Sequence, residues 1–260
     1  MPKLAANLTM LFNEVGFLDR FEAAARAGFR GVEFLFPYAF HADQIADRLN
    51  RFQLDLVLHN LPAGNWDAGE RGIACHPNRV AEFQDGVGEA IKYAKVLGVR
   101  QLNCLVGIAP ADARREQAHE TLVENLRFAA GALAAEQIDL LIEPINTFDI
   151  PGFFLSRTQQ ALALIEQVNA PNLFVQYDIY HMQRMEGEIA ATLKAQLPRI
   201  RHVQLADNPG RNEPGTGELN YAFLFQWLDE IGYTGWVGCE YKPRAGTEAG
   251  LGWRDQFGVR

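Results

Sequence analysis

Cysteine is scarce in this sequence, and its placement argues against the sites that depend on it. The three cysteines, Cys75, Cys104 and Cys239, lie far apart, and no two form a Cys-x-x-Cys pair. An odd, scattered set predicts neither a disulfide framework nor a zinc knuckle. Unpaired cysteines are typical of a reducing compartment, so we expect a cytoplasmic location.

Positive charge and long apolar runs are also lacking. There are 24 Lys and Arg residues against 32 Asp and Glu residues, which gives a formal net charge of −8. This charge repels nucleic acid and anionic membrane surfaces, so we expect neither as a partner. No stretch approaches about 18 uninterrupted apolar residues, and the N-terminal residues do not resemble a signal peptide. We therefore expect neither membrane insertion nor export.

Nucleotide-binding loops are missing as well. No Gly-x-Gly-x-x-Gly segment follows the first apolar run, and no Walker loop is present. An open, doubly wound nucleotide-binding sheet therefore loses its main support.

The sequence does contain eight short apolar runs that alternate with longer amphipathic stretches. This alternation is typical of strand and helix units around a parallel sheet. The expected strands are Leu4–Leu8, Gly31–Phe34, Asp55–His59, Gln101–Leu105, Asp139–Glu143, Phe174–Asp178, His202–Ala206 and Trp236–Glu240. The expected helices are Phe17–Ala27, Ala42–Arg51, Arg79–Leu97, Glu116–Ala135, Thr158–Val168, Glu186–Gln196 and Tyr221–Glu230. With 260 residues, this pattern predicts a single (β/α)8 TIM barrel spanning residues 1–260.

Acids and an amide lie at the ends of four consecutive expected strands. Glu143, Asp178 and Glu240 close the fifth, sixth and eighth strands, and Gln204 lies in the seventh. Chemistry in such barrels takes place at this end, so we expect the four side chains to converge. Their oxygen atoms suit Mg²⁺ or Mn²⁺, and a cation would relieve the repulsion among the acids. One such acid alone would ordinarily be a solvated loop residue, but four in register favour a divalent metal site.

Segments along nearly the whole chain resemble the hydroxypyruvate isomerase family of the xylose isomerase-like barrels, a superfamily that also holds ketose 3-epimerases and a DNA repair endonuclease. Among the most specific are Leu-Ile-Glu-Pro-Ile-Asn (141–146), Tyr-Asp-Ile-Tyr-His-Met-Gln-Arg (177–184), Glu-Pro-Gly-Thr-Gly-Glu-Leu-Asn-Tyr (213–221) and Gly-Cys-Glu-Tyr-Lys-Pro (238–243). The resemblance implies conversion of hydroxypyruvate to 2-hydroxy-3-oxopropanoate, with Glu143 and Glu240 as proton donor and acceptor. The epimerase relatives have histidine where this chain has Gln204. An amide is a weaker ligand, so the need for a metal stays open.

The proton chemistry requires two groups on opposite sides of the substrate. Strands five and eight lie three places apart on an eight-stranded ring, so Glu143 and Glu240 are expected to face each other. Two histidines, His59 and His181, could donate hydrogen bonds to substrate oxygens or have a structural role. Three cationic residues could bind a substrate carboxylate: Lys242, Arg71 and Arg211. Lys242 is favoured as the anchor because it lies two residues beyond Glu240.

Other functions stay open at this point. A larger sugar acid such as a 2-oxo-tetronate, or a neutral ketose, would undergo the same proton chemistry, and the size of the pocket would decide. A metal-dependent phosphodiesterase on this barrel would need a histidine cluster and a basic groove, which six histidines and a net charge of −8 disfavour. The sequence also leaves open whether the chain forms a homo-oligomer.

Overall fold

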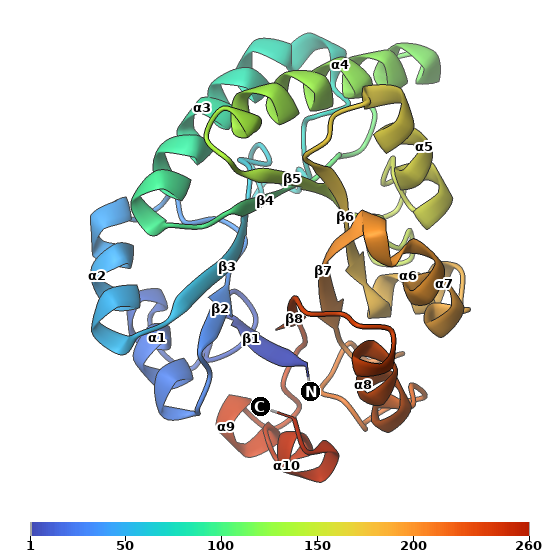
Figure 1. The fold of residues 1–260 in the computed structure, drawn as a ribbon. Coiled ribbons are helices and arrows are strands. Elements are labelled where there is room, and N and C mark those ends of the chain that lie inside the picture. Colours follow the sequence, from blue (N-terminus) through green and yellow to red (C-terminus); the bar gives the residue numbers. More distant parts are fainter. Residues whose placement is uncertain (1, 260) are drawn as a thin grey trace.

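The computed structural model describes residues 2–259, and its eight strands form a closed barrel in chain order. Figure 1 shows the strands as an inner ring with the helices around it. The strands are β1 (Lys3–Asn7), β2 (Gly31–Glu33), β3 (Asp55–Asn60), β4 (Gln101–Cys104), β5 (Asp139–Ile142), β6 (Leu173–Asp178), β7 (Ile200–Leu205) and β8 (Trp236–Cys239). All neighbouring pairs are parallel, including β1 with β8. The predicted (β/α)8 barrel is confirmed.

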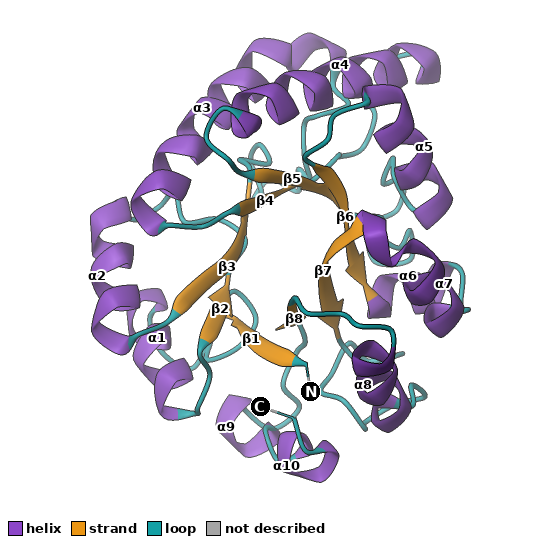
Figure 2. Cartoon of the chain, in the orientation of Figure 1, coloured by secondary structure: helices purple, strands orange, loops and turns teal. Residues whose placement is uncertain are grey.

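Figure 2 shows the helices as an outer layer around the strands. Apolar residues of these helices are buried in one core with those of the strands. The helices are α1 (Phe17–Arg26), α2 (Ala42–Phe52), α3 (Val80–Leu97), α4 (Arg115–Ala134), α5 (Thr158–Val168), α6 (Ile179–Met185), α7 (Ile189–Gln196), α8 (Tyr221–Glu230), α9 (Thr247–Gly250) and α10 (Trp253–Phe257). Short 3-10 turns, η1 (Pro77–Arg79) and η2 (Leu197–Arg199), precede α3 and β7. Within the described residues, no helix is both long enough and apolar enough to cross a membrane.

The segment between β6 and β7 differs from the sequence prediction. A single helix over Glu186–Gln196 was expected, whereas the chain forms α6 directly after β6 and then α7. The cause is Asp178, whose Oδ1 accepts hydrogen bonds from the backbone N–H groups of Tyr180 and His181. A strand-end acid that caps the following helix removes the need for a loop.

The interior of the barrel is apolar at one end and polar at the other. Near the amino ends of the strands, a small cluster of Ala5, Val57, Leu58 and Leu141 packs against Phe174 and Trp236. Toward the carboxyl ends of the strands the interior is a polar layer that contains the buried Glu33. This carboxylate accepts hydrogen bonds from the side chains of Asn7 (3.0 Å), His202 (2.7 Å) and Gln204 (2.7 Å). A Cβ atom at Gly238 would lie 2.4 Å from the Glu33 oxygens, so only glycine leaves them room.

Candidate active site

A cavity of about 360 Å³ opens at the carboxyl ends of the strands. Most of the predicted site residues line it: Glu143, Glu240, Gln204, His181, Arg71, Arg211 and Lys242. Asp178 is fully buried beside this cavity, with His181 between it and Glu143. His59 does not line the cavity, because its ring stacks behind Phe34 with no exposed surface.

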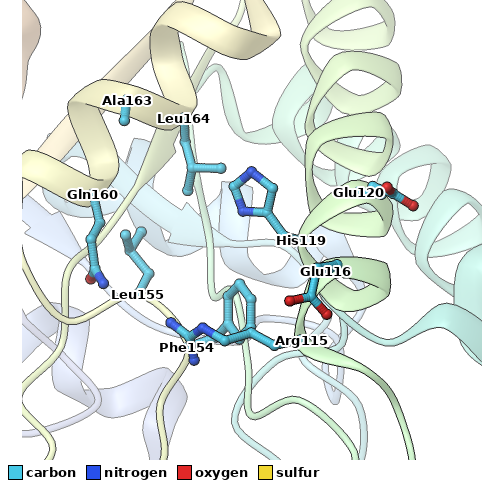
Figure 3. A pocket seen from close by; sticks show the side chains of 9 residues that line it. All are labelled: Arg115, Glu116, His119, Glu120, Phe154, Leu155, Gln160, Ala163 and Leu164. Carbon is cyan, nitrogen blue, oxygen red and sulfur yellow. The ribbon is translucent and has the colours of Figure 1, made fainter.

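A second cavity, of about 500 Å³, lies outside the barrel between α4 and α5. Figure 3 shows that His119 and Leu164 point toward it from facing helices, with Phe154 below them. Its acids, Glu116 and Glu120, lie along one helix. The group of three candidate metal ligands found within residues 2–259 lies inside the barrel instead, so chemistry favours the smaller cavity.

Glu143 is held at the edge of the barrel by two amide side chains. Its Oε2 accepts hydrogen bonds from Asn103 Nδ2 at 3.1 Å and from Gln176 Nε2 at 3.0 Å. Both amides project from neighbouring strands, β4 and β6, so the position of the carboxylate is set by the sheet. Its Oε1 faces His181 Nε2 at 3.8 Å. One oxygen is therefore anchored, and the other is directed toward the reaction space.

Glu240 and Asp178 share the charge of one arginine. Arg211 Nη2 lies 3.1 Å from Glu240 Oε2 and 3.7 Å from Asp178 Oδ2. Arg211 comes from the loop after β7 and has a positive φ of 53°. Its backbone oxygen accepts a hydrogen bond from the Lys242 N–H at 2.7 Å, which joins this loop to the segment after β8. Arg211, which the sequence analysis named as a candidate to bind the substrate carboxylate, thus already compensates the charges of two buried acids.

Burial dominates the electrostatics of the acids. Loss of solvent, together with the charges of Glu240 and Asp178, raises the pKa of Glu143 well above its usual value. Desolvation also raises the pKa of Glu240 to about 8, although Arg211 opposes the shift, and it raises the pKa of Asp178. The pKa values of all three carboxyl groups are thus raised by their surroundings, and perturbed pKa values in a cavity are typical of groups that exchange protons with a substrate.

The pKa values of the two candidate histidines are shifted in the opposite direction. Desolvation lowers the pKa of His181 well below its usual value, and the charges of Arg211 and Arg184 add to this effect. Desolvation likewise lowers the pKa of His59 to about 4. Both rings are therefore neutral at physiological pH.

The residues present fit a divalent cation. Carboxylate oxygens of Glu143 and Asp178 lie within 4.8 Å of each other and of a ring nitrogen of His181, and the two acids belong to the oxygen set that the sequence predicts. Asp178 Oδ2 is buried and accepts no hydrogen bond among the described residues; its ion pair with Arg211, at 3.7 Å, leaves its coordination incomplete, and a bound cation would complete it. Gln204 Oε1 accepts a hydrogen bond from Gln176 Nε2 at 2.7 Å, and its Nε2 donates to Glu33, so its carbonyl faces the same polar layer.

Sequence reasoning overlooked the amides that hold the acids. Gln176 lies two residues before Asp178 and therefore on the same side of β6, a spacing that could have singled it out. Asn103 carries no comparable signal, because its partner Glu143 belongs to another part of the chain.

The comparisons with known proteins agree with this geometry. A family model described as xylose isomerase-like TIM barrel matches residues 21–257. Hydroxypyruvate isomerase of Escherichia coli (strain K12) is 58% identical over 257 residues, which cover 99% of this chain and 100% of that protein. The chain belongs to the hydroxypyruvate isomerase family. A 2-oxo-tetronate isomerase of Cupriavidus necator is also similar, with 51% identity over 97% of each chain.

Solved structures place the hydroxypyruvate isomerase family in a wider group of barrels. A crystal structure described as AP endonuclease, family 2, from Brucella melitensis has a TM-score of 0.96 and 48% identity, covering 98% of this chain and 99% of that one. D-Psicose 3-epimerase from Clostridium cellulolyticum H10 has a TM-score of 0.74 and 22% identity, covering 98% and 91%. At that identity the likeness concerns the fold alone.

The raised pKa of Glu240 predicts a pH effect on stability in this family member. At pH values between the ordinary glutamate pKa and about 8, the folded chain keeps a proton on Glu240 that the unfolded chain has released. Folded protein then binds more protons than unfolded protein, so this contribution to stability is full at low pH and is lost as the pH rises through about 8.

We therefore expect wild-type protein in chelator to lose free energy of unfolding relative to Glu240→Gln as the pH rises. Denaturant titrations of both proteins at several pH values measure this difference. The comparison removes the opposite effect of the buried histidines, which both proteins share. A difference that stays constant with pH would contradict the assignment.

Proposed function

We propose that this chain is an isomerase that interconverts hydroxypyruvate and 2-hydroxy-3-oxopropanoate. The observation that carries the proposal is the presence of two buried glutamates with raised pKa values, Glu143 and Glu240, in one cavity of about 360 Å³. The full-length similarity to a hydroxypyruvate isomerase, at 58% identity, supports the choice of substrate.

The reaction moves a proton between adjacent carbons. One glutamate, ionised, takes a proton from the CH2OH carbon of hydroxypyruvate, and the electrons form an enediolate. A proton is then returned to the carbon that was the ketone, the hydroxyl proton of the first carbon passes to the former ketone oxygen, and the aldehyde forms at the first carbon. Glu143 and Glu240 are the donor and acceptor in this proposal. Glu143 directly follows β5, Glu240 directly follows β8, and both line the cavity.

The negative charge of the enediolate needs stabilisation. We propose that Glu143, Asp178, Gln204 and Glu240 hold a divalent ion, Mg²⁺ or Mn²⁺, which supplies Lewis-acid stabilisation of the enediolate oxygens. His181 contributes as a neutral hydrogen-bond donor from the adjoining wall. The positive charge of Arg211 offsets the negative charges of Glu240 and Asp178. In this proposal the same charge also attracts the substrate.

Lys242 is the proposed anchor for the substrate carboxylate. It lines the cavity, is exposed, and has no ion-pair partner within the described part of the chain. The rival Arg71 is more constrained: its Nη1 donates to the backbone oxygens of Trp66 (3.0 Å) and Glu70 (2.7 Å), and its guanidinium lies 4.1 Å from the Trp66 ring centre. We propose that Arg71 holds the loop after β3 over the cavity and contacts substrate from there.

This assignment predicts that Lys242→Met raises the Michaelis constant for hydroxypyruvate by about tenfold or more, the scale of one charge-assisted hydrogen bond. The effect on a neutral three-carbon ketose should be much smaller, because the ketose has no carboxylate. Steady-state kinetics with both substrates measure the difference. Arg244→Met is the matched control, since Arg244 does not line the cavity. Equal effects of Lys242→Met on both substrates would contradict the assignment and turn attention to Arg71 and Arg211.

A direct assay tests the function itself. Purified protein is incubated with hydroxypyruvate in D2O, and both acids are followed by proton nuclear magnetic resonance. We expect 2-hydroxy-3-oxopropanoate to appear with solvent deuterium on the carbon that received the proton. No conversion of hydroxypyruvate, together with conversion of a 2-oxo-tetronate, would shift the substrate to the larger acid that the Cupriavidus necator relative's name indicates.

The phosphodiesterase alternative is not favoured. The candidate ligand group found among residues 2–259 contains one histidine and two acids, whereas a zinc phosphodiesterase needs a histidine-rich cluster. We propose further that residues 1–260 form one domain, that the partner is a small sugar acid and neither nucleic acid nor a membrane, and that the location is cytoplasmic, which the three free, buried cysteines favour.

A further inference from the structure

Asn146 is a buried residue in the loop after β5, and it contacts the ring of His181. Its Nδ2 lies 2.7 Å from His181 Nδ1, on the side of the imidazole that faces away from the acids. The other ring nitrogen, Nε2, lies 3.8 Å from Glu143 Oε1 and 3.7 Å from Asp178 Oδ2. Whether Nε2 carries a hydrogen therefore decides what His181 offers to the site.

The orientation of the Asn146 amide is fixed independently of His181. Its Oδ1 accepts hydrogen bonds from the backbone N–H groups of Phe148 at 3.1 Å and Asp149 at 2.8 Å. Rotating the amide by half a turn would place its NH2 group against these two donors and leave them unsatisfied. The NH2 group therefore faces His181.

Both hydrogens of the Asn146 NH2 group have acceptors. One is directed to Asp149 Oδ2 at 3.1 Å, and the other to His181 Nδ1. Asp149 is itself held by the Tyr180 hydroxyl at 2.9 Å and by Arg184 Nη1 at 2.6 Å. A hydrogen on His181 Nδ1 would meet another N–H, so Nδ1 must be the acceptor and a neutral ring must carry its hydrogen on Nε2.

We propose that Asn146 is a positioning residue that fixes His181 in its Nε2–H form, so that His181 presents a hydrogen-bond donor to the cavity. This inference rests on the proposed function for its catalytic meaning. A protonated Nε2 has no free electron pair, so it cannot bind a metal ion. The ion-binding set then consists of oxygen atoms from Glu143, Asp178, Gln204 and Glu240, and the His181 N–H is left to stabilise an oxygen of the enediolate.

The test is a nitrogen nuclear magnetic resonance measurement on protein labelled with ¹⁵N-histidine. Long-range proton–nitrogen correlations distinguish the two neutral forms of imidazole and the cation, and His181→Gln identifies the signals of His181 by their loss. We expect the Nε2–H form in chelator and the same form after Mg²⁺ is added. An Nδ1–H form, a cation, or a Mg²⁺-dependent shift of Nε2 typical of ligation would overturn the proposal.

Substitutions at Asn146 provide the second arm. Asn146→Asp replaces the donor by an acceptor, so we expect His181 to change to the Nδ1–H form. Asn146→Ala removes the constraint, so we expect both forms. In each variant kcat should fall about 10- to 100-fold, with a smaller change in KM, as is usual for residues that orient a catalytic group. Tyr180→Phe is the matched control, because it removes another hydrogen bond to Asp149 Oδ2 and leaves the contact between Asn146 and His181 in place.

The two arms separate the inference from the proposed function. The magnetic resonance measurement needs no substrate, so it reports on Asn146 even if hydroxypyruvate is not converted. If Asn146→Asp does not fold, the wild-type spectrum and Asn146→Ala decide. An unchanged His181 form and an unchanged kcat in Asn146→Ala would overturn the role of Asn146 while leaving the isomerase proposal intact.

Discussion

Glu143→Gln and Glu240→Gln should each lower kcat for hydroxypyruvate by at least about a hundredfold, the lower scale for losing a general acid or base. Glutamine keeps the shape of the side chain. In Glu143→Gln its carbonyl oxygen can still accept the hydrogen bonds from Asn103 and Gln176, so the variant should fold normally. Steady-state kinetics, with circular dichroism as a check of the fold, measure the loss.

Asp139→Asn is the matched control for Glu143→Gln. Asp139 lies at the opposite end of β5, where its carboxylate pairs with Arg201 at 2.9 Å on the outer surface. Removing this charge should leave turnover nearly unchanged. Near-wild-type turnover of folded Glu143→Gln or Glu240→Gln would contradict the proposed proton transfer.

Removal of divalent metal should have a comparably large effect on activity. The oxygen ligands favour Mg²⁺ or Mn²⁺ over zinc, and the amide of Gln204 binds more weakly than an imidazole would. We therefore expect exhaustive chelation to lower activity by at least about a hundredfold, since a bound cation supplies several kcal/mol of transition-state stabilisation. Mg²⁺ or Mn²⁺ should restore activity. Circular dichroism should show that the barrel stays folded throughout.

Asp178→Asn tests the proposed metal site while keeping the structural role of residue 178 at the start of α6. Asparagine can still accept the hydrogen bonds from the Tyr180 and His181 N–H groups that begin α6, because those bonds use only one oxygen. The negative charge and the Oδ2 atom, which accepts no hydrogen bond among the described residues, are lost, so metal affinity should fall sharply while the helix remains. Full activity in wild-type protein shown by elemental analysis to be free of metal would rule out the ion and leave Gln204, His181 and Lys242 to stabilise the enediolate.

The periodicity of the sequence was sufficient to predict the barrel, because every strand is a short buried run and every neighbour along the chain is also a neighbour in space. The rule that the carboxyl ends of parallel strands meet on one side also predicted that Glu143 and Glu240 lie at the same end of the barrel. It could not separate His59 from His181, because one lies near the end of an apolar strand and the other just after one, and only the folded barrel shows that His59 packs behind Phe34. Nor could it find Asn146, whose partner His181 lies 35 residues away on another element.

The position of Glu33 also bears on the order of folding. Glu33 belongs to β2, yet two of its three hydrogen-bond donors, His202 and Gln204, lie on β7, 169 and 171 residues later in the chain. A partial barrel that ends before β7 would leave this carboxylate buried without those donors, at a cost of several kcal/mol. Early half-barrels are therefore penalised, and contacts of such high sequence separation form late and slowly. We therefore expect the polar layer beneath the cavity to be completed only when the ring of strands closes.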